Sequence, residues 1–176
     1  MISTIELTDQ GSTLVYTFDD VMLYHGPGSP GGVAHAVKVM ERVLPLLEPS
    51  GLAERREIEV QTAFAGPGAR DAFEMVTRAV TEGRYVVDDA LVRPERGPTH
   101  ERFVFRLGYR GRNVTVALRD GYVSTEFIAL AGMEQRTAEQ EDRLTVLKRE
   151  MAELLLATPA VEVYDAHPDW REEWRP

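Results

Sequence analysis

The sequence contains no cysteine, and this absence excludes several kinds of chemistry. Disulfide bonds, thiolate zinc sites, iron–sulfur clusters and cysteine nucleophiles all require thiol groups. A metal ion would have to be held by histidine, aspartate or glutamate side chains alone. We therefore expect no tightly bound zinc or iron and no other cofactor.

An excess of positive charge and a long apolar run are also absent. The formal net charge is −9, so the field of the protein opposes binding to phosphate backbones and to anionic membranes. No window approaches the roughly 18 consecutive apolar residues of a transmembrane helix, and the N-terminus lacks the pattern of a signal peptide. We expect a cytoplasmic protein whose partner is neither nucleic acid nor a membrane.

The length and the apolar content indicate a folded chain with one core. A chain of 176 residues has about the length of one domain, and Leu, Ile, Val and Phe make up about a quarter of it. We expect a single domain over residues 1–176. Within it, the pattern predicts an N-terminal hairpin over 1–18, a core over 19–130, and a C-terminal helix and tail over 137–176.

Alternating apolar residues predict the strands. They occur in a hairpin over 3–18, in strands over 57–64 and 84–87, in a three-stranded antiparallel meander over 103–109, 114–118 and 122–130, and in an edge strand over 161–164. The tail that follows, with Trp170 and Trp174, is too polar to form a core by itself.

Helical periodicity predicts the remaining elements. A short helix capped by Asp19 precedes a Gly- and Pro-rich loop, and a second helix follows with Ser29 as its N-cap, with Pro45 expected to kink or end it. A third helix is expected over 69–81. A fourth begins at a capping box formed by Thr137 and Gln140, with Glu139 and Arg143 spaced to pair on its outer face. The expected fold class is α+β: helix–strand–helix plus three antiparallel strands in a mixed sheet.

The loop over 24–32 carries the most informative residues. Gly26, Gly28 and Gly31 match the G-x-G-x-x-G dinucleotide fingerprint, but Pro27 and Pro30 remove two of the N–H groups that would hold a pyrophosphate. A nucleotide is therefore not expected.

The same loop brings together a histidine, a hydroxyl group and the start of a helix. Helix N-termini attract anions, so a carboxylate or an enolate would fit beside His25 and Ser29. In the alternative interpretation, Ser29 merely caps the helix and His25 fills a turn.

Three blocks of the sequence resemble the E-subunit family of formylmethanofuran dehydrogenase. Residues 18–31 (FDDVMLYHGPGSPG) resemble its short helix followed by His-Gly-His-x-Cys-Pro-Gly, residues 71–77 (DAFEMVT) its Asp-Ala helix, and residues 103–116 its antiparallel strand pair. The resemblance implies an α+β domain related to the catalytic domain of glyceraldehyde-3-phosphate dehydrogenase.

The departures from this family concern its metal ligands. His25 is kept, but Pro27 stands at the second histidine and Ser29 at the cysteine of the motif. The cysteine before the Asp-Ala helix and the C-terminal zinc ribbon are also missing. The resemblance therefore supports the fold more than it supports a metal site.

Other polar residues are weaker candidates. His35 lies off the apolar stripe of its helix, so it faces either the same cleft or solvent. His100 reaches the site from a sheet edge or belongs to a surface connection. Asp71 is favoured in the first turn of a helix without any catalytic role, although it falls in a block of the family resemblance. Asp88 and Asp89 follow a strand and form either an acid/base or metal pair or, as most paired aspartates at strand ends do, a solvated turn.

These residues support three hypotheses about function. The first is a lyase, isomerase or cyclase that acts on a small carbonyl or carboxylate compound: His25 moves the proton, Ser29 and the helix N-terminus hold the oxyanion, and His35 or His100 supplies a second group. The second is a metal-dependent enzyme that uses His25, another histidine, and Asp71 or Asp89. The third is a non-catalytic accessory subunit.

A stripe of apolar residues on the C-terminal helix also bears on assembly. It consists of Leu144, Leu147, Met151 and Leu154, and the predicted meander needs an edge partner or a cover. Both features predict a homodimer.

Overall fold

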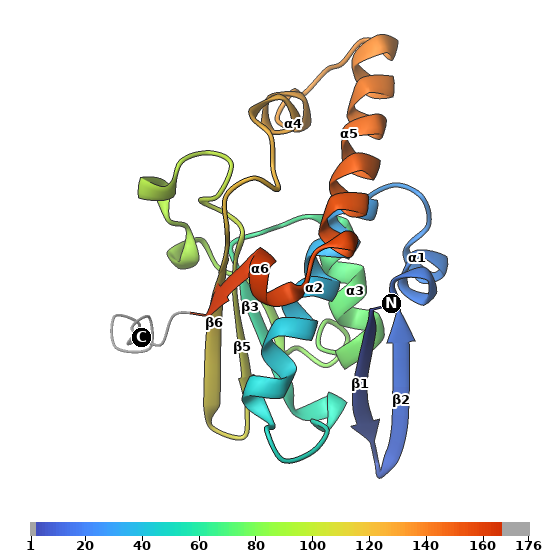
Figure 1. The fold of residues 1–176 in the computed structure, drawn as a ribbon, viewed down its shortest axis with the longest axis vertical. Helices are drawn as coiled ribbons and strands as arrows, with labels where there is room; N and C mark the ends of the chain where they lie inside the picture. Colours follow the sequence, from blue (N-terminus) through green and yellow to red (C-terminus); the bar gives the residue numbers. More distant parts are fainter. Residues whose placement is uncertain (1–2, 167–176) are drawn as a thin grey trace.

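The computed structural model describes residues 3–166, which form an α+β fold with two sheets (Figure 1). The first sheet is the predicted N-terminal hairpin of β1 (Thr4–Asp9) and β2 (Ser12–Thr17). Its turn residues Gln10 and Gly11 both have positive φ, 51° and 85°, as a two-residue type I′ turn requires. The predicted Trp170 and Trp174 tail lies outside the described residues.

The second sheet has five strands in the order β4-β3-β5-β6-β7. Their bounds are β3 (Ile58–Thr62), β4 (Tyr85–Val87), β5 (Val104–Tyr109), β6 (Arg112–Leu118) and β7 (Tyr164–Ala166). β4 pairs parallel to β3, whereas the other pairs are antiparallel, so the sheet is mixed as expected.

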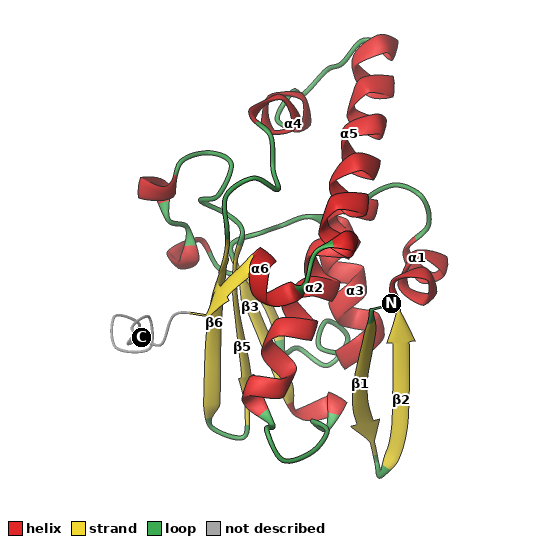
Figure 2. Ribbon diagram, viewed as in Figure 1, coloured by secondary structure: helices red, strands yellow, loops and turns green. Residues whose placement is uncertain are grey.

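Figure 2 shows how the helices are arranged around the two sheets. They are α1 (Phe18–His25), α2 (Pro30–Leu47), α3 (Pro67–Thr77), α4 (Thr125–Ala131), α5 (Ala138–Ala157) and α6 (Ala160–Val163). The central helix α2 contacts β5 and β6 of the large sheet and also β1 of the hairpin. One buried apolar cluster takes in side chains from all three parts, including Leu7, Val37 and Leu107.

The helices α4 and α5 extend the molecule beyond the end of the sheet, as Figure 1 shows. Arg143 of α5 forms a two-pronged ion pair with Glu126 of α4 at 2.7 and 2.8 Å, which joins the two helices. The predicted pairing of Arg143 with Glu139 is therefore wrong. We call α4, the following loop and the first half of α5, residues 125–148, the α4–α5 arm.

The predicted third meander strand over 122–130 is also wrong. Ser124 accepts a hydrogen bond from the Phe127 amide and so begins helix α4, which replaces the strand. On the side of β6 away from β5, the paired strand is β7, which begins at Tyr164, the last residue of the expected edge strand. A local apolar pattern of this length fits either a strand or a short helix, and the N-cap decides between them.

Two helix ends differ from the expected ones. Thr17, rather than Asp19, caps α1 through a capping box with Asp20. Pro45 does not end α2 where it occurs, because the helix continues through it to Leu47. The capping box of Thr137 and Gln140 is present as predicted.

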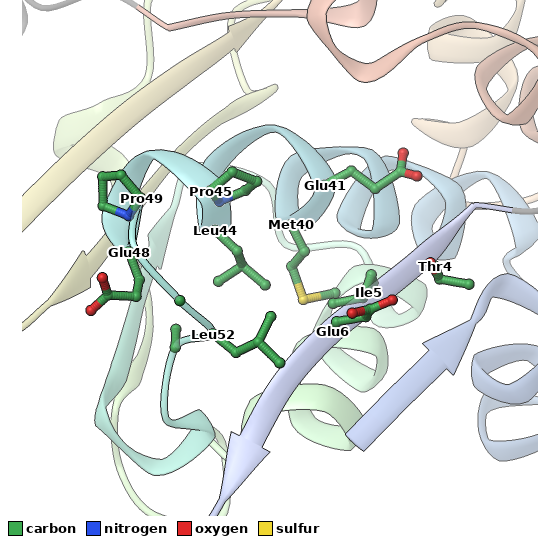
Figure 3. Close-up of a pocket in the computed structure, with 12 residues that line it drawn as sticks. Thr4, Ile5, Glu6, Met40, Glu41, Leu44, Pro45, Glu48, Pro49 and Leu52 are labelled. Atoms are coloured by element: carbon green, nitrogen blue, oxygen red, sulfur yellow. The ribbon is translucent and has the colours of Figure 1, made fainter. Parts of the chain in front are cut away.

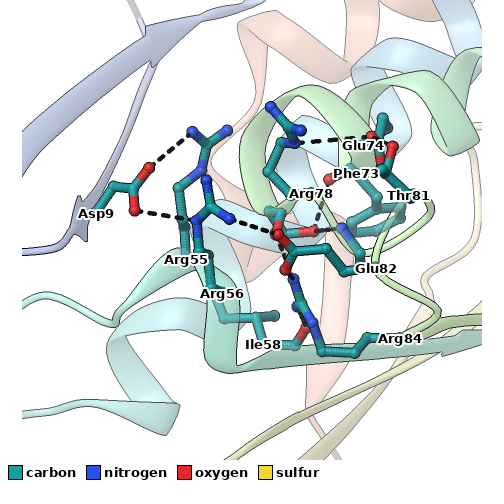
Figure 4. A network of polar contacts seen from close by, with 12 residues as sticks. Asp9, Arg55, Arg56, Ile58, Phe73, Glu74, Arg78, Thr81, Glu82 and Arg84 are labelled. Carbon is teal, nitrogen blue, oxygen red and sulfur yellow. Dashed lines mark hydrogen bonds and ion pairs between the residues drawn. The ribbon is translucent and has the colours of Figure 1, made fainter.

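A network of charged residues fastens the hairpin to the body (Figure 4). Asp9 of β1 accepts from Arg55 and Arg56, and Arg56 in turn reaches Glu82 at 2.7 Å. Arg84 continues the network from Glu82 to backbone carbonyls of Ile58 and of the end of α3. The network joins β1 to the C-terminal end of α3. The Gly- and Pro-rich loop lies at the other end of α3.

None of the helices between residues 3 and 166 is long and apolar enough to span a membrane.

Candidate functional site

His25 and Asp71, two of the predicted site residues, lie in direct contact. Nδ1 of His25 is 2.8 Å from Oδ2 of Asp71, which joins the last residue of α1 to the second turn of α3. Because a carboxylate only accepts hydrogen bonds, Nδ1 carries the hydrogen and donates it. In the neutral imidazole ring, this tautomer has its lone pair on the other nitrogen, Nε2.

The other ring nitrogen of His25 has a different environment. The His25 side chain is only 8 % exposed, and its Nε2 is buried without a hydrogen-bond partner among the described residues. A buried polar atom without a partner costs free energy, so such atoms concentrate at sites that a ligand or a proton completes. The alternative in which His25 fills a turn is also wrong, because His25 is the last residue of helix α1.

Glycines bring the start of α2 against the start of α3. A Cβ atom on Gly68 would lie 2.4 Å from the Ser29 carbonyl oxygen and 2.9 Å from the Val33 amide nitrogen. A Cβ atom on Gly32 would lie 3.2 Å from the amide nitrogen of Ala69. The absence of side chains thus lets two helix N-termini meet, and neither helix has an acidic residue in its first turn.

Ser29 stands at the N-cap position of α2, as predicted, but its side chain makes no capping hydrogen bond. Pro30 occupies the first helical position, which needs no N–H donor. The hydroxyl group of Ser29 is therefore not used by the helix. The G-x-G-x-x-G match in this loop connects two helices, whereas the dinucleotide fingerprint follows a strand.

A cavity of about 480 Å³ opens beside this junction, between the body and the α4–α5 arm; we call it the arm pocket. Ser29, Gly31 and Gly68 contribute the helix starts. The arm and the segment before β5 contribute side chains that were not predicted as site residues, among them Phe127, Leu144, Lys148, Arg102 and Phe103. The volume lies in the range of about 300 to 1,000 Å³ that is usual for small-molecule sites.

Sequence patterns gave little signal for these additional residues. Their positions are far apart along the chain, and the fold alone brings them together. Lys148 is the exception, because it is one of only two lysines in a chain rich in arginine. Its ammonium group donates to the Gly28 carbonyl oxygen at 3.1 Å and so lies at the Gly- and Pro-rich loop.

His35 faces neither the cleft nor solvent, and both expectations for it are wrong. It is fully buried, its Nδ1 lies 2.7 Å from the Tyr164 hydroxyl, and its Nε2 lies 3.3 Å from the Met151 sulfur. Burial lowers the pKa of His35 from 6.5 to about 3, so the ring is neutral. The periodicity of the sequence cannot reveal the burial of His35, because its partners Tyr164 and Met151 belong to β7 and α5, which are distant along the chain.

His100 also lies apart from the His25–Asp71 pair. Its Nδ1 contacts Thr99 and its Nε2 lies 2.9 Å from Asp120. The structure therefore supports its interpretation as part of a surface connection. Asp88 caps a short 3-10 helix, and Asp89 pairs with Arg102, in agreement with a solvated turn.

The hypothesis of a metal site finds no ligand set in the described part of the chain. No three His, Asp or Glu side chains among residues 3–166 converge closely enough to hold a metal ion. His25 and Asp71 are the two proposed ligands that do meet. Asp89, His35 and His100 have the partners given above, and His167 lies outside the described residues.

A second cavity, of about 390 Å³, lies between the hairpin and α2 (Figure 3). Its floor is apolar, with Met40 and Leu44, and its rim carries Glu6, Glu41 and Glu48. None of the predicted site residues lines it.

Comparison with known proteins adds no relative to this description: no protein-family model matches the chain, and no curated protein matches it either. Any function assigned to the candidate site therefore has to be argued from the geometry of the site.

Proposed function

We propose that this protein is a small-molecule enzyme of the lyase, isomerase or cyclase type, in which His25 transfers a proton to or from a carbonyl or carboxylate compound. The observation that carries the proposal is the His25–Asp71 contact of 2.8 Å together with a buried, unpartnered Nε2 on the same ring. No thiol is needed for this chemistry.

Asp71 acts as the positioning residue in this scheme. A carboxylate that accepts from one imidazole nitrogen fixes the ring orientation and tautomer, and it stabilises the imidazolium that forms when the other nitrogen takes a proton. Nε2 of His25 is then a general base in the ground state and a general acid after proton transfer. Such groups typically contribute about 10²- to 10⁴-fold in rate.

The loop that follows His25 supplies the complementary charge. Gly26, Pro27 and Gly28 lead from His25 to Ser29, whose hydroxyl group is not engaged in capping and which lines the arm pocket. An enolate or carboxylate formed by proton removal would be stabilised by the partial positive charge at the starts of α2 and α3. His35 and His100 have no part in the scheme.

Proton exchange in D₂O tests this proposal and does not require the identity of the natural substrate. The protein is incubated with a panel of small carbonyl and carboxylate compounds, and the loss of carbon-bound proton signals is followed by ¹H NMR. We expect exchange with a subset of the panel, because a proton taken by His25 returns from solvent as a deuteron.

Matched variants assign the exchange to His25. His25→Asn keeps a donor for Asp71 but lacks Nε2, so exchange should fall by about 10²- to 10⁴-fold. His100→Asn, at a histidine paired with Asp120 instead, should leave exchange unchanged. Equal exchange by the His25→Asn variant, or no exchange with any compound, would overturn the proposal, and the latter result would favour the accessory-subunit hypothesis.

A further inference from the structure

The arm pocket has an aromatic floor. Phe64 and Phe103 stack with ring centroids 4.7 Å apart and planes inclined by 26°. The buried His35 ring supports Phe103 from 4.6 Å, so the floor is fixed by the core. Flat aromatic faces favour offset stacking with a planar, unsaturated ligand.

The arm adds apolar walls opposite this floor. Phe127 and Ile128 of α4 and Leu144 of α5 line the cavity. Pro67 and Pro98 complete the apolar lining from the body. A ligand held between these surfaces would therefore carry an apolar, metabolite-sized body.

Basic side chains surround the same cavity. Lys148, Arg102 and Arg136 line it, whereas Glu101 is the acidic residue among its lining. Arg136 is held by Glu141 at 2.7 Å and by the carbonyl groups of Leu130 and Met133, and Arg102 pairs with Asp89. Lys148 is half-buried and donates one hydrogen bond to the Gly28 carbonyl, so the other donors of its ammonium group can meet a ligand at the loop.

We propose that the arm pocket binds a small aromatic or conjugated anion, a carboxylate or a phosphate ester, with its ring against the half-buried Phe64, which Phe103 backs from the core, and its anionic group at Lys148. Calling this ligand a substrate rests on the proposed function; the binding itself does not. His25 is not among the residues that line the arm pocket, so the binding proposal does not depend on it.

Binding is measured by titrating ¹⁵N-labelled protein with cinnamate and with phenyl phosphate, followed by amide NMR. Cinnamamide, which has the same body without the charge, and acetate, which has the charge without the body, are the reference compounds. We expect saturable shifts at the amides of Gly31, Gly32, Gly68 and Ala69 with at least one aromatic anion. The better of cinnamate and phenyl phosphate identifies the anionic group.

Two neighbouring variants provide the charge test. Lys148→Gln should weaken binding about tenfold or more, as expected for loss of a charge-assisted hydrogen bond. Arg149→Gln removes the same charge from the adjacent residue, which is 65 % exposed and pairs with Glu153, and should bind like the parent protein. The His25→Asn variant should also bind normally, so loss of proton exchange and loss of binding can be told apart.

Three results would overturn the inference. These are equal binding of cinnamamide, equal weakening by Arg149→Gln and Lys148→Gln, and shifts that map to the cavity between the hairpin and α2. The absence of any saturable shift with both aromatic anions would overturn it as well. None of these results would alter a His25-dependent proton exchange.

Discussion

At the scale of single residues, His25 and His35 show that the fold determines which chemical role a histidine can have. They lie ten residues apart, and both are largely or fully buried. His25 has a carboxylate on one nitrogen and no partner on the other, whereas both nitrogens of His35 contact neutral groups in the core. The first arrangement suits proton transfer, and the second suits packing.

Burial of neutral His35 predicts a loss of stability in mild acid. Its folded-state pKa, about 3, lies below the unfolded value of 6.5. Between these values the unfolded chain binds a proton that the folded chain does not, so the stabilisation present above pH 6.5 is lost as the pH falls. The expected slope approaches about 1.4 kcal/mol of unfolding free energy per pH unit well below pH 6.5.

Urea unfolding at several pH values between 7 and 5, with a variant as the comparison, measures this slope. The double variant His35→Phe with Tyr164→Phe removes both partners of the contact, and so leaves neither one buried alone. Its stability should depend less on pH than that of the parent protein. Identical slopes for the two proteins would contradict the assignment of the titration to His35.

The candidate site could be predicted from the sequence only in part. His25, Ser29 and Asp71 were predicted because a histidine, a hydroxyl group and an early helical carboxylate have recognisable local contexts. The sequence does not reveal the 2.8 Å contact between His25 and Asp71, because it joins residues 46 positions apart. The same limit explains why His35 was assigned wrongly and why most of the arm pocket was missed.

At the scale of elements, the close approach of α2 and α3 depends on glycine. Gly68→Ala would place a Cβ atom 2.4 Å from the Ser29 carbonyl oxygen, which is backbone and has little freedom to move. We expect a loss of about 1 to 3 kcal/mol, the usual cost of overpacking. Thermal or urea unfolding measures it.

Gly28→Ala is the matched control for this effect. A Cβ atom on Gly28 would have no neighbour within 4 Å, and the residue does not have a positive φ. Its stability should stay within about 0.5 kcal/mol of the parent protein. If both variants lost the same stability, the close approach of the two helices would not be the cause.

Periodicity predicts most strands and long helices correctly, and the exception over residues 122–130 has a physical reason. The hairpin, β3, β5, β6 and α5 follow their expected ranges closely because each has a clear period and an identifiable turn or cap. Residues 122–130 alternate weakly, and the Ser124 cap makes them a loop and helix α4 instead. The position of the α4–α5 arm depends on contacts between distant segments, so it cannot be predicted from the local sequence pattern.

At the scale of the whole molecule, the homodimer stays a prediction, but the apolar stripe on α5 no longer supports it. Leu144, Leu147 and Met151 are buried within the chain itself, and only Leu154 of the stripe is exposed. The edge strand β4, with Val86 and Val87 each 46 % exposed, is the remaining apolar edge of the large sheet. Light scattering should give about twice the chain mass of 19.8 kDa, and a monomer at micromolar concentration would contradict the prediction.

The measurement that tests the central claim most directly is the tautomer of His25 by ¹⁵N NMR of the imidazole nitrogens, assigned with the His25→Asn variant. The claim is that Asp71 holds His25 so that Nε2 is a free base. It predicts that the neutral ring carries its hydrogen on Nδ1 and none on Nε2, with this pattern lost in Asp71→Asn. A hydrogen on Nε2 of the neutral ring, or a pattern unchanged in Asp71→Asn, would contradict the claim.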